Sequence, residues 1–528
     1  METQKRKQNS PEKSPRQKIP KMKLKTIEKL PRESLQDIMR HVGNRREAAL
    51  VCKEFYSAVC DVDNSEDIYK LVFNQFIDDL QIQANSIFHS KRKISEIELT
   101  KVFFDDAKFL TFAQIFIKFS FVIKKVTMNK CLISENQLCE LLSVTKNLEE
   151  LSMINCRIKH YNKTRVNFKL CKVKKLSFAD TKFRDVGITQ STKNNAITNL
   201  LSMVVENSPL ESFECNESFV NFFPFTKVKL NHLKIDNAIP RGTRLGSLVE
   251  MQFNLNSLDL MDCFIMDDTL VSIKKSLDSL KVLKINLSGV SCDGFTILQS
   301  LLLSELHLIV GKTKWITNSI VESNFSTITS LYINVEELMI EKESFEHMLR
   351  QFTNLKKLHV KTNLVDIISV IFNRPNRLQS CTVEFSYMQE PHYLSILAPK
   401  LRECFPLLKA FNVINRDPIF ARRGDFSFLR FFNKLEKLKV DGFIINQHLH
   451  KYALMHIHLT HLELIETSVS NNVEYVFDNS LAEVFKSFAN NLKFMKIDCS
   501  VSSFLKEHSE LQFPVEFRRG KSQVYRSR

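Results

Sequence analysis

The sequence predicts an α/β chain in which a short helical N-terminal region precedes a long, curved solenoid of stacked strand and helix units. Three observations predict this fold: a strand-like apolar pattern that returns at a nearly constant interval, helical apolar stripes between successive strands, and two further helical stripes near the N-terminus. The 528 residues are enough for a large core, but stacked units extend that core along one dimension.

The first 26 residues are rich in charge and poor in apolar side chains. Residues 1–29 hold ten Lys or Arg against three Glu, a net charge of +7. We therefore expect residues 1–26 to be a disordered basic tail. The Lys5-Arg6-Lys7 cluster is typical of a nuclear import signal. Ser10 and Ser14 each precede a proline, as proline-directed phosphorylation requires.

Residues 27–75 predict a small helical domain. Pro31 lies at a first helical position, where its missing N–H costs nothing. Three apolar stripes at helical spacing follow: Leu35, Ile38, Met39 and Val42; then Val51, Cys52, Phe55 and Val59; then Ile68, Leu71 and Val72. A segment this short cannot bury the surface of all three apolar stripes by itself. We therefore expect it to pack on a partner or on the next domain.

The order of residues in this segment resembles an F-box, the helical motif that docks onto the Skp adaptor of cullin–RING ubiquitin ligases. It begins with Leu30-Pro31 and continues to Leu50-Val51-Cys52-Lys53, with the aromatic Phe55 three residues after the cysteine. Two features depart from the family. The connection between Val42 and Leu50 is shorter than usual, and Phe55 stands where the family commonly has Trp.

The resemblance implies contact with the Skp adaptor and, through it, with a cullin–RING ligase. The residues that it assigns to the adaptor contact are Leu30, Pro31, Leu35, Ile38, Leu50, Val51 and Phe55. The alternative is that residues 30–60 form only a helical cap on the domain that follows.

A strand pattern with apolar residues at positions 1, 4 and 6 recurs along the rest of the chain. Its starts are Ile94, Ile123, Leu148, Val173, Leu210, Leu230, Leu255, Leu280, Leu303, Ile328, Leu355, Leu378, Leu408, Leu435, Leu459 and Leu492. Most intervals between them lie between 20 and 29 residues, the range of leucine-rich repeats. We therefore expect residues 76–515 to form a leucine-rich-repeat solenoid of about 14–16 repeats.

Helical stripes fill the intervals between the strands. Phe345, Met348, Leu349 and Phe352 form one stripe, and Leu481, Val484, Phe485 and Phe488 form another. Stacking such units places parallel strands on the concave face and helices on the convex face. Polar residues or cysteines follow several strands, as at Asn155-Cys156 and Asp262-Cys263. These pairs are similar to the cysteine-containing repeats common in F-box proteins.

Candidate target-binding residues lie on the concave face and in a long insertion. Positions 3 and 5 of each strand point into that face, which becomes more basic in its C-terminal third. Two long intervals, at 181–195 and 416–425, predict loops. Guanidinium groups pair bidentately with carboxylate or phosphate, so the second loop suits an acidic or phosphorylated protein segment unless it is only a solvated insertion. The candidate substrate-binding residues are Arg422, Arg423, Lys437, Lys439, His461 and Lys496.

Charge is concentrated at the two ends of the chain. The formal net charge is +16, the first 29 residues supply +7, and residues 517–528 add five Lys or Arg without an acidic residue. We assign 516–528 to a basic C-terminal tail. Because the body is nearly balanced, the pattern argues against a nucleic-acid-binding protein.

Composition also argues against membrane, metal and catalytic roles. No apolar run reaches the roughly 20 residues that span a bilayer, and no secretory signal opens the chain, so we expect a cytoplasmic or nuclear protein, or one found in both. The twelve cysteines include no Cys-x-x-Cys pair, and no Gly-rich phosphate loop is present. His456, His458 and His461 are not expected to converge on a metal. We therefore expect no cofactor and no enzymatic activity.

These patterns together favour a substrate-recognition subunit of a Skp–cullin–F-box ubiquitin ligase. The main alternative is a leucine-rich-repeat interaction scaffold with a degenerate F-box and no ligase role. A small anionic cofactor beneath the repeats, as in some plant hormone-receptor relatives, would require a buried cluster of Lys and Arg. An enzyme would require a polar pocket that the repeat pattern does not predict.

Overall fold

The structure is a computed structural model. It describes residues 69–74, 85, 87–90, 93–159, 170–184, 190–236, 244–310, 325–335, 342–363, 365–372, 377–386, 405–416, 429, 432, 434–442, 459–465, 494–498 and 525–526.

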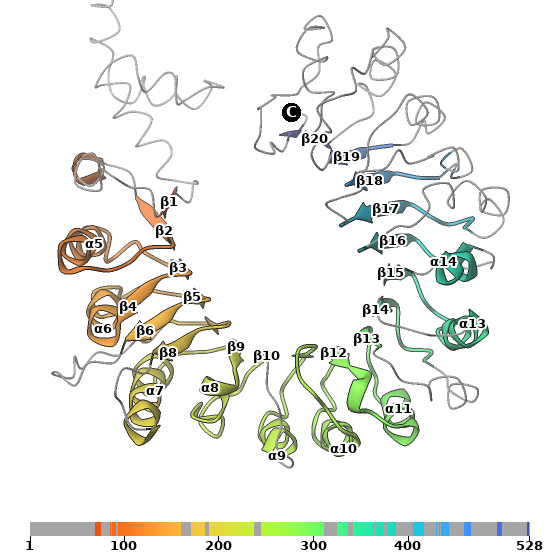
Figure 1. Cartoon of the computed structure of the whole chain (residues 1–528), viewed down its shortest axis with the longest axis horizontal. Helices are drawn as coiled ribbons and strands as arrows, with labels where there is room; N and C mark the ends of the chain where they lie inside the picture. The colour runs from red at the N-terminus through yellow and green to blue at the C-terminus, as the bar shows by residue number, and fades with distance from the viewer. Residues whose placement is uncertain are drawn as a thin grey trace, which may run out of the picture.

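One long sheet runs through all of the described repeats. Its strands are β1 (Tyr69–Asn74), β2 (Ile94–Thr100), β3 (Lys125–Asn129), β5 (Glu150–Ile154), β7 (Lys175–Phe178), β9 (Ser212–Asn216), β10 (His232–Asp236), β11 (Ser257–Leu260), β12 (Val282–Asn286), β13 (Glu305–Ile309), β14 (Ser330–Asn334), β15 (Lys357–Lys361), β16 (Ser380–Phe385), β17 (Ala410–Asn415), β18 (Lys437–Asp441), β19 (His461–Ile465), β20 (Phe494–Asp498) and β21 (Tyr525–Arg526). From β1 to β20 each strand pairs in parallel with the next one along the chain, whereas β21 pairs antiparallel with β20. Figure 1 shows the resulting horseshoe, with this sheet lining its inner side.

Helices form the outer layer of the horseshoe (Figure 1). They are α5 (Asp106–Lys118), α6 (Glu135–Ser143), α7 (Gln190–Val205), α8 (Glu217–Val220), α9 (Arg244–Glu250), α10 (Asp267–Ser276), α11 (Cys292–Gln299), α13 (Lys342–Arg350) and α14 (Val365–Phe372). Local sequence explains several of their N-termini. Asp105 caps α5, and Ser134 with Gln137 forms a capping box at α6. On α13, Phe345 and Met348 turn inward and are buried, as the helical stripe predicts.

The predicted repeat is confirmed strand by strand. Fifteen of the sixteen predicted starts lie two residues before a strand, and the sixteenth, Ile94, is the first residue of β2. In β11, Leu258 and Leu260 at positions 4 and 6 are buried, while the intervening positions are half-buried. This alternation follows from the two-residue period of a strand, and it joins the repeats into one apolar core. The fold is therefore a curved α/β leucine-rich-repeat solenoid.

The turns that follow the strands explain the cysteines of the repeat. Lys101, Lys130, Asn155 and Asp180 occupy equivalent positions and have positive φ values between 49° and 55°. The next residue in each turn points inward. The thiols of Cys131 and Cys156 each donate to a carbonyl of the preceding repeat at 3.3 Å, on Leu99 and Met128 respectively. The Thr181 hydroxyl makes the same bond, to the Met153 carbonyl at 2.7 Å.

Two local expectations were wrong. The stripe of Ile68, Leu71 and Val72 was expected to be helical, but Leu71 and Val72 lie in strand β1, where Val72 is exposed and Phe73 is buried. A strand is favoured there because it pairs with β2 and satisfies its backbone groups. The interval 181–195 was expected to form a loop. Instead it contributes β8 (Lys182–Arg184) and the first turns of α7.

A small second sheet absorbs part of that interval. It consists of β4 (Leu132–Ser134), β6 (Arg157–Lys159) and β8, which pair in parallel directly after the turns of three successive repeats. Ile133, Ile158 and Phe183 point into the core from its three strands. The extra residues therefore continue the repeat instead of leaving it.

Candidate functional site

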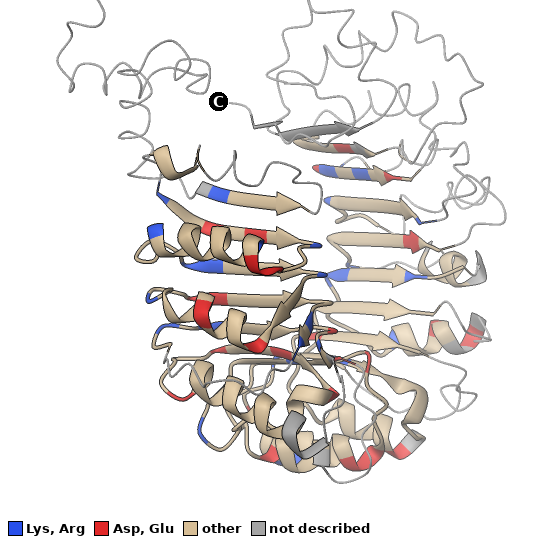
Figure 2. Ribbon diagram, turned by 60° about the vertical axis from the view of Figure 1, so that its left-hand side comes forward, with Lys and Arg blue, Asp and Glu red and all other residues tan. Residues whose placement is uncertain are grey.

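The candidate site is the concave face formed by the side chains at positions 3 and 5 of the long sheet. Positions 4 and 6 are buried in the strands of the long sheet from β2 to β18, so positions 3 and 5 must point the other way, into the open side of the horseshoe. Successive strands are in register, so equivalent positions of neighbouring repeats lie side by side in rows. Figure 2 shows Lys, Arg, Asp and Glu distributed along these strands.

Ion pairs between neighbouring strands dominate the N-terminal part of this face. Glu150 lies between two lysines in the position-3 row, at 2.9 Å from Lys125 and 2.7 Å from Lys175. Burial acts against ionisation of Glu150, but hydrogen bonds from the two ammonium groups outweigh it and hold the pKa of its carboxyl below the ordinary value. At the first strand, Lys70 pairs with Glu98 in the same manner.

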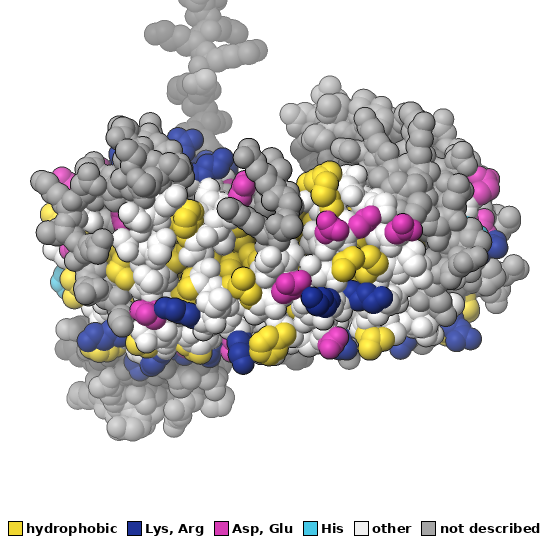
Figure 3. Space-filling view, turned by 90° about the horizontal axis from the view of Figure 1, so that it is seen from below, with side chains coloured by type: hydrophobic (Ala, Val, Ile, Leu, Met, Phe, Trp, Pro, Cys, Tyr) yellow, Lys and Arg dark blue, Asp and Glu magenta, His cyan; other side chains and the backbone are white. Residues whose placement is uncertain are grey.

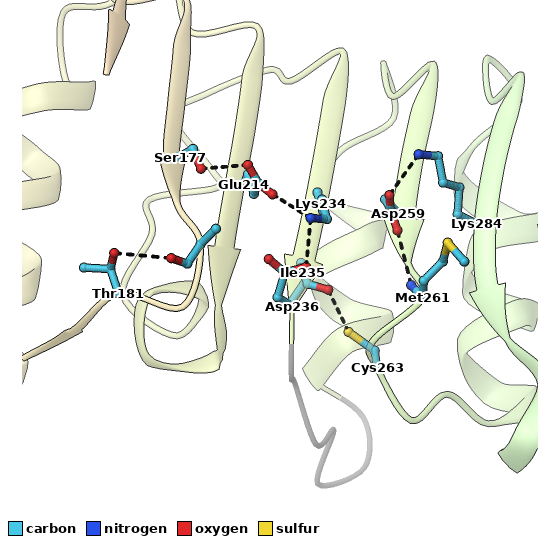
Figure 4. A network of polar contacts seen from close by, with 11 residues as sticks. Ser177, Thr181, Glu214, Lys234, Ile235, Asp236, Asp259, Met261, Cys263 and Lys284 are labelled. Carbon is cyan, nitrogen blue, oxygen red and sulfur yellow. Dashed lines mark hydrogen bonds and ion pairs between the residues drawn. The ribbon is translucent and has the colours of Figure 1, made fainter. Parts of the chain in front are cut away.

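A polar network continues along the position-5 row, as Figure 4 shows. Glu214 accepts hydrogen bonds from the Ser177 hydroxyl at 2.7 Å and from the Lys234 ammonium at 2.6 Å. Burial opposes the charge of Glu214, yet these bonds leave the pKa of its carboxyl below the usual value. The pKa of Asp236 shifts in the other direction. Its carboxylate lies 3.2 Å from the Lys234 ammonium, but its side chain is less exposed than that of Glu214, and burial raises its pKa.

The row of ion pairs gives way to rings at the middle of the horseshoe. We call His307, Tyr332 and His359, which occupy position 5 of three successive strands, the aromatic cluster. The His307 and Tyr332 rings are stacked with centroids 5.2 Å apart, and the His359 ring meets Tyr332 edge-on with centroids 4.6 Å apart. A carboxylate bounds each end of the cluster. Glu305 lies 2.6 Å from His307 Nε2, and Glu384 lies 3.3 Å from His359 Nε2.

Burial sets the charge of the aromatic cluster. Only 20% of the His307 side chain is exposed, and its desolvation lowers the pKa of the imidazole despite the opposing hydrogen bond to Glu305. His307 is therefore neutral at pH 7. The Glu384 carboxyl has a pKa below its ordinary value because the His359 hydrogen bond outweighs the effect of burial. The middle of the concave face thus offers polarisable rings between two carboxylates.

The structure brings some of the predicted substrate-binding residues together on neighbouring strands. Lys437 on β18 lies opposite His461 on β19, and Glu463 on β19 lies opposite Lys496 on β20. Lys437 is exposed. Lys439, by contrast, pairs with Asp441 at 3.4 Å and with Glu463 at 4.0 Å, so its charge is compensated locally. Arg422 and Arg423 lie outside the described residues, as does the F-box-like set of Leu30, Pro31, Leu35, Ile38, Leu50, Val51 and Phe55.

Position 7 supplies polar contacts that the sequence pattern did not single out. Arg416 lies 3.6 Å from Glu384 and 3.5 Å from Asp441, and both carboxylates occupy position 7 of their repeats. The selection of positions 3 and 5 missed them because it stopped one alternate position short, whereas β16 and β18 continue through position 7. The repeat pattern could have identified the aromatic cluster, since three ring side chains occur at position 5 of consecutive repeats.

Two further properties bear on the kind of site. In the described ranges, no three His, Cys, Asp or Glu side chains are gathered as ligands of a metal ion. None of the helices in those ranges is both long enough and apolar enough to cross a membrane. The face seen in Figure 3 carries exposed hydrophobic side chains between charged ones. Phe253 and Val271 are among the exposed large hydrophobic residues of the described ranges.

No family model and no curated protein matches the sequence. Among solved structures, the chain is similar to that in a TLR13–ssRNA13 complex, with 15% identity and a TM-score of 0.40 over 81% of this chain; it spans 59% of that chain. An internalin, InlF, from Listeria monocytogenes has 12% identity and a TM-score of 0.27, over 66% of this chain and 81% of its own. A Rad7–Elc1 complex in yeast has 12% identity and a TM-score of 0.31, over 74% of this chain and 90% of the other. The assignment of the fold therefore rests on the repeat and the long parallel sheet of this chain itself.

Proposed function

We propose that this chain is the substrate-recognition subunit of an SCF-type ubiquitin ligase. The part of residues 27–75 that precedes β1 would supply the F-box that binds the Skp adaptor, and the concave face would bind the target protein. The observation that carries the proposal is the F-box-like order of residues directly before the solenoid, whose first strand begins at Tyr69. Chain connectivity therefore joins the adaptor-binding segment to the target-binding face without a long linker.

The concave face suits a polypeptide target. Its paired Lys and Glu side chains present polar groups whose charges are already balanced, and such groups favour specificity over non-specific attraction. The aromatic cluster provides the kind of anchor that carries most of the binding energy in protein interfaces, where Tyr is enriched. An acidic or phosphorylated segment could reach Lys437, which is exposed and has no ion-pair partner in the described part of the chain.

The proposal assigns this chain no catalytic step and no cofactor. The target's lysines would be held near a conjugating enzyme that other subunits recruit, and their effective concentration would rise because the attack becomes intramolecular within the complex. The basic tail of residues 1–26 would allow this to occur in the nucleus as well as in the cytoplasm.

Co-purification of the full chain with the Skp adaptor and a cullin tests the proposal. The wild-type chain is compared with Pro31→Ala/Leu35→Ala, which removes a helix start and an apolar anchor of the F-box-like segment. Leu110→Ala/Leu302→Ala is the matched control, because both side chains are more than half exposed on the solenoid. The F-box variant should lose at least about 1–2 kcal/mol of adaptor binding, as truncated interface anchors do, whereas the control should bind like the wild type.

Either of two results contradicts the proposal. If the wild-type chain does not bind the adaptor, the F-box-like segment is degenerate and the chain is a leucine-rich-repeat scaffold. If both double variants lose the adaptor equally, capture depends on general apolar surface and not on residues 27–75.

A further inference from the structure

Five cations that have no ion-pair partner among the described residues gather at one rim of the solenoid, away from the concave face. We call Lys101, Lys130, Arg157, Lys159 and Lys182 the basic rim. The first two occupy the left-handed turns after β2 and β3, and the other three lie in the small sheet, on β6 and β8. Blue segments in Figure 2 lie where the strands of the N-terminal half end.

The small sheet holds three of these cations in a regular array. Arg157 and Lys182 are register partners on adjacent strands, which lie about 4.8 Å apart. Lys159 follows Arg157 two residues along the same strand, about 6.6 Å away on the same face. Because paired strands are stiff, the positions of these charges are set by the sheet and not by the flexible side chains alone.

The charges of the basic rim are not neutralised within the described residues. None of its five cations makes an ion pair there, although ion pairs are frequent on the concave face. Four carboxylates lie nearby in the sequence: Glu135 directly follows β4, Asp185 follows Lys182 by three residues and lies outside the described residues, and the other two are Asp105 and Asp180. Asp105 is paired with Lys108 at 3.2 Å, and Asp180 precedes β8 by two residues. The connection at 160–169 adds Lys163, Arg165 and Lys169 to the sequence and no acidic residue.

An apolar pair adjoins the cations. Phe103 bridges to Leu132, and Leu132 is in turn the register partner of Arg157, so one row runs from Phe103 through Leu132 and Arg157 to Lys182. Phe103 is 51% exposed, so about half of its surface faces solvent beside the cations. Lys101 and Lys130 immediately precede this pair in their turns. An apolar spot is thus bordered by cations on two sides.

We propose that the basic rim and the Phe103–Leu132 pair bind an acidic polypeptide segment that carries an apolar residue. Four of the five cations are lysines, which act as point charges and suit carboxylates spread along a chain better than a single phosphate held bidentately. On an extended segment, alternate side chains lie about 6.6–6.8 Å apart, close to the spacing of Arg157 and Lys159. Nucleic-acid sites interleave aromatic rings with cations, whereas Phe103 lies at one end of its row. This site is independent of the proposed ligase role.

Fluorescence anisotropy with the full chain tests this proposal. The probe is a labelled seven-residue peptide of alternating Asp and Glu with one Phe at its centre. Arg157→Glu/Lys182→Glu should raise its Kd by about tenfold or more, because two attractive contacts become repulsive. Lys274→Glu/Lys275→Glu on α10 makes the same change of charge at two exposed lysines and should alter the Kd by less than about twofold.

A second pair of measurements isolates the apolar contact. Phe103→Ala should weaken the Phe-containing peptide and leave a peptide with Ser at its centre unaffected. Circular dichroism and the Tm establish that each variant is folded; if the Glu variant is not, Arg157→Gln/Lys182→Gln replaces it. The proposal is overturned if the wild type does not bind the peptide. It is also overturned if the rim variant binds as well as the wild type, since the basic tails then hold the peptide, or if a 20-nucleotide oligo-dT binds the rim more tightly than the peptide.

Discussion

The imidazole of His307 lies stacked on the ring of Tyr332, with their centroids 5.2 Å apart and their planes inclined by 21°. This contact lies between stretches of the concave face on which side-chain ion pairs are frequent. On the N-terminal side of it, lysines and carboxylates pair from strand to strand, and on the C-terminal side Arg416 and Lys439 pair with acidic residues. On the described part of the concave face, the ring contact therefore marks a place where aromatic side chains stand between ion pairs.

His307 should make the protein less stable in mild acid. Its pKa in the folded state lies below the ordinary value of 6.5 because burial disfavours the imidazolium, so the unfolded chain binds more protons at intermediate pH. The free energy of unfolding should therefore fall as the pH is lowered through about 6.5. Urea unfolding at about pH 7.5 and about pH 5.5 should show a smaller loss for His307→Gln than for the wild type. Equal losses in the two proteins would show that His307 does not contribute.

The pair of Glu214 and Lys234 should couple at neutral pH and uncouple in acid. The 2.6 Å contact is partly exposed, so a double-mutant cycle with Glu214→Gln and Lys234→Met should give a coupling of about 0.5 kcal/mol. The pKa of Glu214 is lowered in the folded state, so this stabilisation is present above the ordinary value of 4.5 and is lost as the pH falls through the folded-state pKa. Chemical unfolding at about pH 7 and at a series of lower pH values follows the coupling; a coupling that is already lost at about pH 5, above the ordinary value, contradicts the prediction.

Cys156 should be replaceable by serine more readily than by alanine. Its buried thiol donates to the Met128 carbonyl, and the Thr181 hydroxyl makes the equivalent bond one repeat later, so an oxygen fits this position. Cys156→Ser keeps the donor, whereas Cys156→Ala leaves the carbonyl without it, at a cost of about 1 kcal/mol relative to serine. Thermal unfolding of the two variants checks this order, and a lower Tm for the serine variant would reverse it.

Leu258 should contribute far more to stability than an equally large exposed leucine. Its side chain is fully buried at position 4 of β11, so Leu258→Ala should cost about 2–5 kcal/mol by lost burial and an unfilled cavity. Leu302→Ala is the matched control, since that side chain is 66% exposed, and it should stay within about 0.5 kcal/mol of the wild type. Denaturant unfolding provides both values. Similar costs for the two variants would contradict the position-4 rule.

Gly442 should not accept a side chain. It has a φ of +80°, and an added Cβ would lie 2.0 Å from the Asn415 carbonyl oxygen, so Gly442→Ala should destabilise the protein by about 1 kcal/mol or more. Gly246→Ala in α9 is the control, because its Cβ meets the rotatable Ser272 hydroxyl and helix propensity favours alanine. Hydrogen exchange of the neighbouring strands measures the local effect, and equal protection in both variants would count against the prediction.

The amino-acid sequence by itself determined the repeat, the concave-face strand of each predicted repeat, and the burial of apolar positions in strands such as β11. These properties follow from short-range alternation. Leu258 and Leu260 are the apolar residues at positions 4 and 6 of β11, and this alternation is enough to turn one face of the strand toward the core. The prediction that Phe345 and Met348 lie on the buried face of a helix is confirmed for the same reason. The stripe around Leu71 failed because residues spaced for a helix also allow an edge strand, and only pairing with β2 decides between them.

The tertiary structure alone decided which charges are neutralised and which remain available. Ser177 and Glu214 are 37 residues apart, and Lys234 joins them from a third strand, so no local pattern marks the three as one network. Lys439 and Lys182 are both lysines on strands, yet Lys439 meets two carboxylates and Lys182 has no ion-pair partner among the described residues. Composition fixes how many charges a chain carries, but register between repeats determines their partners, because Coulomb attraction depends on the few ångströms that separate neighbouring strands.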